Sequence, residues 1–156
     1  MDEIKRLQKV LLLVRRSVGW TAEEFGERIG VTRQTINNLE SGRNNLTKTQ
    51  YIAMRSVLDA EIAKYPDETE MLRFVLDAFV DHPETYSKAD KEKILSKANL
   101  LAPAILAGAS SRKDVSKEWL AVTTNLGVIT GAMVASLIGV GLGATSDWLA
   151  KLISDK

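Results

Sequence analysis

The chain has no cysteine and a single histidine, His82, among its 156 residues. Without cysteine there is no disulfide and no thiolate, and one histidine is too few for a zinc site or a nucleophile–base pair. We therefore expect neither enzymatic activity nor a bound metal or other cofactor. The charged, acidic start of the chain is unlike a secretory signal, so the first segment is expected to be cytoplasmic.

Neither sign of charge dominates, since 21 Lys and Arg stand against 20 Asp and Glu. The small basic excess lies in residues 1–64, which hold eleven Lys and Arg against eight Asp and Glu. Residues 65–118 hold eight against ten, and residues 119–156 hold two against two. The first segment is therefore the one best suited to contact with phosphates.

Two short helices joined by a tight turn are predicted within residues 20–43. Thr21 and the glutamate three residues later form the capping box typical of a helix start, and Gly30 allows the chain to turn. Thr32 is suited to cap the second helix, and Gly42 to end it in a left-handed conformation. The apolar positions that face inward are Phe25, Ile29, Val31, Ile36 and Leu39. The other side chains of the second helix are polar and are expected to point outward.

Flanking helices complete the first segment. Apolar residues at helical spacing predict a helix over residues 4–17, which Gly19 ends. A second capping box, formed by Thr47 and Gln50, opens a helix that runs to about Lys64. Residues 1–65 are therefore expected to form one all-α domain.

This pattern resembles the phage-repressor-like (Xre/Cro type) helix-turn-helix family, which includes lambda repressor. The resemblance covers about residues 5–62 and rests on Phe25, Gly30, Val31, Thr35, Ile36, Leu39, Glu40, Gly42 and Arg43. It implies a domain that binds double-stranded DNA in a sequence-specific transcription regulator. The chain departs from the family at Ala22, where many members have a glutamine that braces the recognition helix and reaches a phosphate. Alanine cannot make that contact.

In this geometry the second helix of the pair, the recognition helix, enters the major groove with its first turn and outer face. The expected base-reading residues are Thr32, Arg33, Gln34, Asn37 and Asn38. Arg33 is suited to guanine, and Gln34 or Asn38 to adenine. The expected phosphate-binding residues are Arg43, Asn44, Asn45, Thr47 and Lys48, at the next loop and helix start. Arg15 and Arg16 are expected at a solvated helix end, with added positive charge for the phosphates as the alternative role. Glu40 is expected to hold Arg43 or a backbone N–H.

The middle of the chain, residues 66–111, is expected to be a helical connecting region. Asp67 and Glu70 predict a cap for a helix that closes near His82. Ser87 predicts the start of another helix, which stops before Pro103.

The last segment, residues 112–156, has an unusual run of 28 uncharged residues from Trp119 to Ser146. As a helix its most apolar part would be about 28 Å long, close to the roughly 30 Å of bilayer hydrocarbon. Trp119 and Trp148 would lie about 43 Å apart, the spacing of two interfacial aromatic belts. The run therefore predicts a single transmembrane helix, although the alternative of a helix buried in a soluble oligomer stays open.

Small residues recur at every fourth position of this run, and they are Gly127, Gly131, Ala135, Gly139 and Gly143. Such a stripe, a glycine zipper, lets two helices approach closely. It predicts a helix–helix interface, either in a homodimer or with another helix.

Two functions follow from these features. The first is a dimeric transcription regulator of the repressor-like type, with a cytoplasmic DNA-binding domain that the last helix anchors to the membrane. The second is a membrane-associated or oligomerising effector, or an antitoxin-like protein, in which the helix-turn-helix domain is a regulatory or adaptor module.

Overall fold

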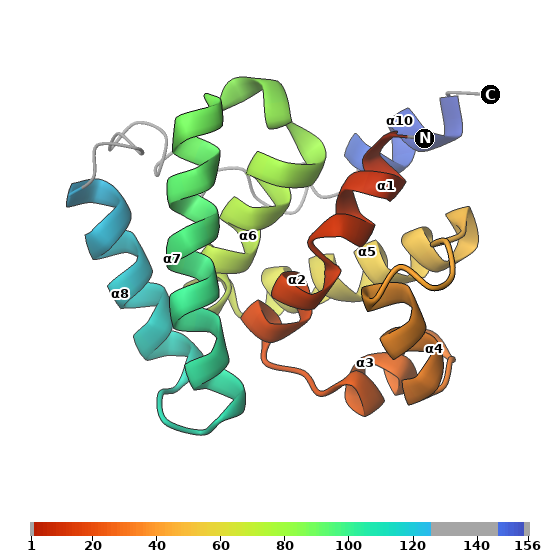
Figure 1. Ribbon diagram of the computed structural model, residues 1–156, viewed down its shortest axis with the longest axis horizontal. Helices are drawn as coiled ribbons and strands as arrows, with labels where there is room; N and C mark the ends of the chain where they lie inside the picture. The colour runs from red at the N-terminus through yellow and green to blue at the C-terminus, as the bar shows by residue number, and fades with distance from the viewer. Residues whose placement is uncertain (1, 126–146, 155–156) are drawn as a thin grey trace.

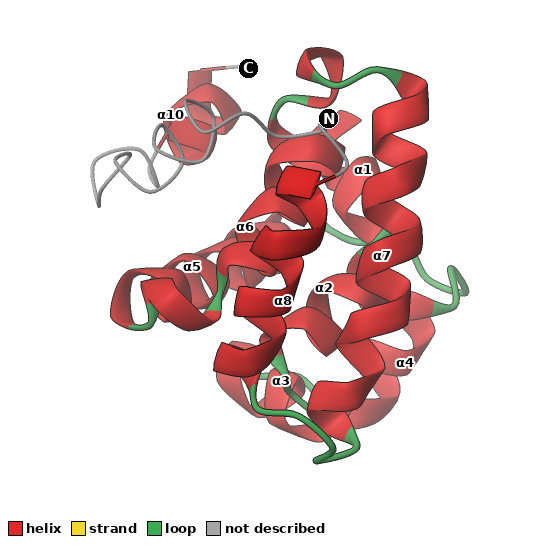
Figure 2. Cartoon of the chain, turned by 90° about the vertical axis from the view of Figure 1, so that its left-hand side faces the viewer, coloured by secondary structure: helices red, strands yellow, loops and turns green. Residues whose placement is uncertain are grey.

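The computed structural model describes residues 2–125 and 147–154, and these residues are arranged as packed helices (Figure 1). The helices are α1 (Asp2–Lys9), α2 (Leu11–Val18), α3 (Ala22–Ile29), α4 (Arg33–Glu40), α5 (Lys48–Lys64), α6 (Glu70–Leu76), α7 (Lys88–Leu106), α8 (Arg112–Asn125) and α10 (Asp147–Ser154). Short helical turns also occur, and they are η1 (Pro66–Glu68), η2 (Asp77–Asp81) and η3 (Pro83–Thr85). Figure 2 shows no strand in the part of the chain that is described, so the all-α prediction is confirmed there.

The helix starts in the first segment follow their predicted caps. The hydroxyl oxygen of Thr21 accepts a hydrogen bond from the amide of Glu24, and the carboxylate of Glu24 accepts one from the amide of Thr21. Thr47 and Gln50 form the same reciprocal pair at the start of α5. The capping predictions in this segment are confirmed, because each depends on residues only three positions apart.

Two boundaries in the chain differ from the sequence predictions. The helix predicted over residues 4–17 is split into α1 and α2, because the amide of Val10 bonds the carbonyl of Leu7, three residues back, at 3.1 Å. The helix predicted to stop before Pro103 continues to Leu106. Proline has no N–H and removes one helical hydrogen bond, but the turn that contains buried Ala102 persists around it.

The predicted cap at Asp67 is also wrong. Asp67 lies inside η1, and α6 begins only at Glu70. Pro66 fixes the backbone for the start of η1, and the hydroxyl of Thr69 then donates to the carbonyl of Tyr65 at 2.8 Å. The turn between α5 and α6 is therefore closed by Thr69 rather than by Asp67.

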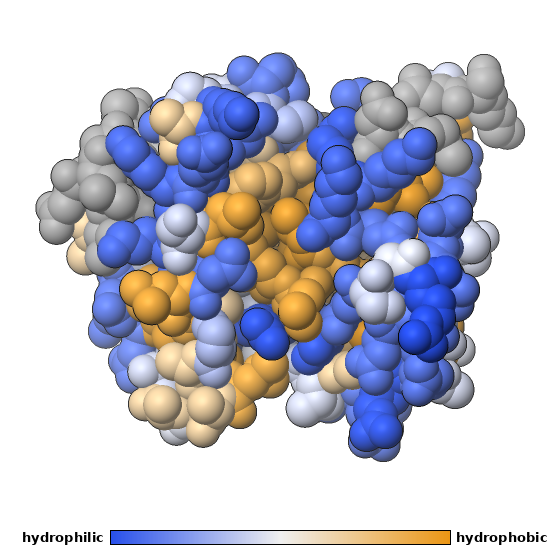
Figure 3. Space-filling view, in the orientation of Figure 1, coloured by the Kyte–Doolittle hydropathy of each residue, from blue (hydrophilic) through white to orange (hydrophobic). Residues whose placement is uncertain are grey.

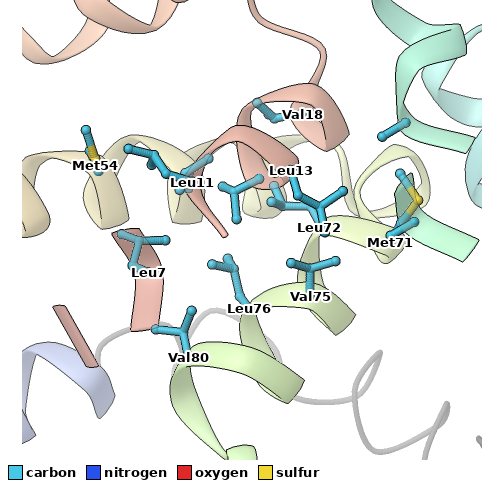
Figure 4. Packing of buried hydrophobic residues seen from close by; sticks show 14 of the residues in the cluster. Leu7, Leu11, Leu13, Val18, Met54, Met71, Leu72, Val75, Leu76 and Val80 are labelled. Carbon is cyan, nitrogen blue, oxygen red and sulfur yellow. The ribbon is translucent and has the colours of Figure 1, made fainter. Parts of the chain in front are cut away.

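One hydrophobic core joins the first 65 residues to the helices that follow. Side chains of α1 and α2 pack beside those of α6 and η2 (Figure 4), and those labelled include Leu7, Leu11, Leu13, Leu72, Leu76 and Val80. Because burying one such side chain stabilises a protein by about 1.5–3 kcal/mol, the later helices stabilise the first segment. The division into residues 1–65, 66–111 and 112–156 stays a prediction, but these parts share one core.

Helices α2 and α7 face the viewer in Figure 1, and the same view in Figure 3 shows apolar surface over the middle of the molecule. Leu12 of α2 and Leu100 of α7 are exposed, and Leu100 keeps 69% of its surface. Beneath the surface α2 and α7 approach closely, since a Cβ added to Gly19 would lie 2.8 Å from Cγ2 of Ile105. Gly19 has φ +82°, so it both ends α2 and admits α7.

The glycine stripe at Gly127, Gly131, Ala135, Gly139 and Gly143 lies outside the described residues. The tryptophans on either side are described, and neither occupies a position suited to a membrane interface. Trp119 is fully buried with its ring 6.0 Å from that of Phe74, and Trp148 packs edge-on against Tyr51 at 5.6 Å. The prediction that these two residues form interfacial belts is therefore wrong. Among the described helices, none is long and apolar enough to cross a membrane.

Candidate nucleic-acid interface

The corner between α3 and α4 depends on Gly26, a glycine within α3. The amide of Val31 donates to the carbonyl of Gly26 at 2.9 Å. A Cβ added to Gly26 would lie 2.5 Å from the carbonyl oxygen of Val31, closer than real Cβ atoms come. Helix α3 can therefore meet the turn only because Gly26 has no side chain. Figure 1 shows α3 and α4 together at one end of the molecule.

Helix α4 has one buried face and one polar outer face, as predicted. Ile36 and Leu39 are buried in the core. Of the predicted base-reading residues, Asn38 is half-buried. The other four are exposed, and they are Thr32, Arg33, Gln34 and Asn37. The exposed side chains of Arg33, Gln34 and Asn37 can reach a ligand, whereas that of Thr32 also caps the helix by accepting a hydrogen bond from the amide of Thr35.

A hydrogen bond orders part of this outer face. The side-chain nitrogen of Gln34 donates to the side-chain oxygen of Asn38 at 3.0 Å. The pair leaves the Gln34 oxygen as an acceptor and the Asn38 amide as a donor. An acceptor beside a donor complements the donor and acceptor that adenine presents in the major groove.

The end of α4 is held by an ion pair whose partner differs from the prediction. Glu40 accepts two hydrogen bonds from Arg15 of α2, from Nε at 2.5 Å and from Nη2 at 3.1 Å. Arg15 also donates to the carbonyl of Trp20 at 3.0 Å. The expectations that Glu40 holds Arg43 or a backbone N–H, and that Arg15 is solvated, are therefore wrong. Both residues are largely buried and fix α4 against α2.

The predicted phosphate-binding residues follow α4 in the loop that leads to α5. Arg43, Asn44, Asn45 and Thr47 are exposed, and Lys48 is half-buried at the first turn of α5. Gly42, with φ +79°, turns the chain into this loop as predicted. The amide of Gln50 donates to the capping hydroxyl of Thr47. The first two amides of α5 have no partner within the helix, as is usual at a helix N-terminus. An exposed basic loop that ends at a helix N-terminus is suited to an anion such as a phosphate.

Helix α5 connects this interface to the later helices through buried charges. Arg55 is only 3% exposed and donates to both carboxylate oxygens of Asp81 in η2, at 2.6 and 2.9 Å. Arg112 of α8 pairs with Glu61 of α5 at 2.6 Å and with Glu68 at 3.1 Å. These contacts join α5 to η2 and α8.

A carboxylate on the same helix receives α10. The indole N–H of Trp148 donates to Asp59, and Arg55 lies 3.8 Å from that carboxylate. Burial raises the pKa of Asp59 to about 6, although Arg55 and the Trp148 hydrogen bond oppose the rise. Burial lowers the pKa of Arg55, but its hydrogen bonds to Asp81 and the charges of Asp81, Tyr51 and Asp59 together outweigh burial and raise that pKa. The contacts of α5 with Asp81 and Trp148 were not predicted, because these two residues are distant from α5 in the sequence.

Comparisons with known proteins cover the same part of the chain. Residues 11–64 match the family described as Helix-turn-helix. Antitoxin HipB of Escherichia coli K12 is 33% identical over 54 residues, which make up 35% of this chain and 61% of that protein. An uncharacterized HTH-type transcriptional regulator of Methanothermobacter thermautotrophicus is 62% identical over 29 residues, 19% of this chain and 42% of that protein. The chain thus spans less than two thirds of each of these relatives, and no solved structure matches it at a comparable level of significance.

Proposed function

We propose, from the premise that residues 11–64 are a helix-turn-helix domain of the Xre/lambda-repressor-like type, that this protein is a sequence-specific DNA-binding transcription regulator. The observation that carries the proposal is the polar outer face of α4, which is exposed while both ends of the helix are fixed. Thr32 caps its start, and the Arg15–Glu40 pair holds its end. A helix presented in this way can enter a major groove without reorganisation.

We assign base reading to Thr32, Arg33, Gln34, Asn37 and Asn38, and phosphate binding to Arg43, Asn44, Asn45, Thr47 and Lys48. One helix of eight residues contacts few base pairs, so we also propose that the protein binds as a dimer to two half-sites. Arg33 is the residue best suited to a bidentate contact with guanine, since its guanidinium is exposed and in the first turn of α4.

The experiment begins with selection of duplexes from a random library by the wild-type protein. Arg33→Ala is then compared with wild type on the selected duplex. We expect a loss of about 1–3 kcal/mol of specific binding and a relaxed preference at one base position. Lys93→Ala, at an exposed basic residue of α7, is the matched control and should bind as wild type. Unchanged affinity and preference in Arg33→Ala would falsify the assignment.

A phosphate contact gives a different signature. Lys48→Ala should weaken binding to all sequences about equally and lower the slope of log K against log salt by about 1. Base preference should stay that of the wild type. A changed preference with an unchanged slope would place Lys48 at a base edge instead.

A second candidate function comes from two of the matched relatives, which are both named Antitoxin HipB. An antitoxin-like regulator would protect the cell from a partner protein in addition to binding DNA. Depletion of this protein in its host distinguishes the two functions. Growth arrest would support the antitoxin function, whereas normal growth with altered transcript levels would support a regulator alone.

Membrane association and pairing through the glycine stripe form a separate, finer proposal. Its support is the uncharged run and the small residues at every fourth position of the sequence. Carbonate extraction of the expressed protein tests it, since release into the soluble fraction would exclude a spanning helix. Gly131→Leu with Gly139→Leu then separates two roles of the stripe. Loss of DNA affinity would indicate dimerisation, and loss of a membrane phenotype with intact DNA binding would indicate an effector.

A further inference from the structure

Helix α1 lies before the matched segment, yet one of its side chains enters the loop between α4 and α5. The side-chain nitrogen of Gln8 donates to the carbonyl of Leu39 at 3.0 Å and to the carbonyl of Asn44 at 2.7 Å. The side-chain oxygen of Gln8 accepts the amide of Leu46 at 3.0 Å. One glutamine thus bonds the backbone before, within and after the exposed loop.

These three bonds tie to α1 a loop whose other hydrogen bonds return to α4, as the amide of Asn44 does to the carbonyl of Asn38 at 3.3 Å. Residues 41–45 are all exposed, and Leu46 is the first buried side chain after α4. An exposed loop without such ties samples many conformations, and fixing each residue costs about 1–2 kcal/mol of entropy at the time of binding. A loop held in advance avoids that cost when it meets a ligand.

Gln8 can hold the loop because α1 is itself anchored. Arg6 donates to the carbonyl of Val80 in η2 from Nε at 2.9 Å and from Nη2 at 2.6 Å. Ile4 and Leu7 are buried in the core on the same helix. Helix α1 therefore connects η2, far along the chain, to the loop after the recognition helix (Figure 1).

We propose that Gln8 is a positioning residue for the DNA-backbone contacts of this domain. It sets the place of the loop that carries Arg43, Asn44 and Asn45, and of the start of α5 with Lys48. Helix α1 is then part of the DNA-binding unit although the family match begins at residue 11. The inference rests on the proposed function, because the contacts that Gln8 would position are those assigned above.

The test compares two glutamines with different expected roles. Gln8→Met keeps nearly the same side-chain length and removes the donor and the acceptor. Gln34→Met makes the same change on the outer face of α4. For each variant the affinity for the selected duplex is measured at several salt concentrations, the base preference is measured by repeated selection, and the active fraction is measured by stoichiometric titration.

Gln8→Met is expected to lower the slope of log K against log salt by about 1–2, which corresponds to one or two lost phosphate contacts, with base preference unchanged. Gln34→Met is expected to alter base preference with the slope unchanged. A loss of folded protein alone would reduce the active fraction and leave the slope as it was, so the slope separates positioning from stability.

Gln8→Glu replaces the methionine variant if that variant does not fold. It keeps an acceptor for the amide of Leu46 but loses the donor to the carbonyls of Leu39 and Asn44, so it should also lower the slope. A wild-type slope in the folded variants would overturn the inference, as would a change in base preference equal to that of Gln34→Met. If the wild-type protein selects no sequence from the library, the proposed function itself fails, and that result is seen before any Gln8 variant is measured.

Discussion

Helices α4 and α5 are neighbours in the chain, but they use arginine in opposite ways. Arg33 of α4 is exposed at the first turn and has its guanidinium free for a ligand. Arg55 of α5 is 3% exposed and donates to Asp81 in η2. The first arrangement is suited to recognition, and the second is suited to holding two parts of a protein together. Exposure and partner, rather than residue type, therefore decide what each arginine does.

The difference extends along both helices. The polar outer side chains of α4 bond mainly within their own helix, as Gln34 does with Asn38. Helix α5 instead makes long-range polar contacts through Arg55, Asp59 and Glu61, which reach η2, α10 and α8. The helix-turn-helix segment thus presents α4 to solvent, and it is joined to the later helices by the polar contacts of α5 and by the apolar packing of α2.

Removing the buried charge of Arg55 is the strongest test of the difference between α4 and α5. Arg55→Met leaves Asp81 without its bidentate partner, and a buried ion pair that loses one member typically destabilises a protein by about 3–5 kcal/mol. We expect a loss of that size in the free energy of unfolding, measured by urea denaturation. Arg33→Met is the matched control and should change it by less than about 0.5 kcal/mol. Equal effects of the two variants would contradict the distinction between the helices.

A smaller effect is expected at the corner that presents α4. Gly26→Ala puts a Cβ 2.5 Å from the carbonyl oxygen of Val31, so α3 and the turn must move apart. Overpacking of this kind costs about 1–3 kcal/mol. Glu27→Ala, at the adjacent exposed position, is the control and should be nearly neutral. Thermal unfolding followed by circular dichroism measures both, and an unchanged transition in Gly26→Ala would show that the corner adapts.

The features predicted from the sequence are those that depend on near neighbours. The capping boxes at Thr21 and Thr47 and the positive φ angles of Gly30 and Gly42 all follow from residues within one turn of helix. The outer face of α4 could be predicted for the same reason, since its apolar and polar residues alternate with the helical period. The resemblance to a known family added the proposal that this face reads bases.

The features that were missed depend on distant parts of the chain. Gln8 and Arg55 look like ordinary polar helix residues, and only the packing of α1 and η2 reveals their partners. Trp119 was assigned to a membrane interface from its spacing, whereas it fills the core beside Phe74. Helical periodicity cannot distinguish an aromatic residue that meets lipid from one that meets another helix. The role of Gly26 was also missed, because it depends on an atom of the following turn.

The smallest expected effect concerns Asp59, which links α5 to α10. Burial raises the pKa of its carboxyl group to about 6 from an ordinary 3.8, so the folded protein binds this proton more tightly than the unfolded chain. Its contribution to stability is therefore greatest below about pH 4 and falls as the pH rises to about 6, by at most about 1.4 kcal/mol per pH unit.

Asp59→Asn keeps an oxygen that can accept the Trp148 indole N–H and removes the titrating charge. Between pH 5 and pH 7 the wild-type protein should lose about 1 kcal/mol of stability relative to this variant. Urea denaturation at the two pH values measures the difference, and Glu84→Gln, at an exposed residue of η3, is the control. If the difference between wild type and Asp59→Asn does not change with pH, the Asp59 carboxylate is solvated. In that case the hydrogen bond from Trp148 to Asp59 does not hold α10 against α5, and Arg55 is the buried charge of α5 that still contacts a later part of the chain.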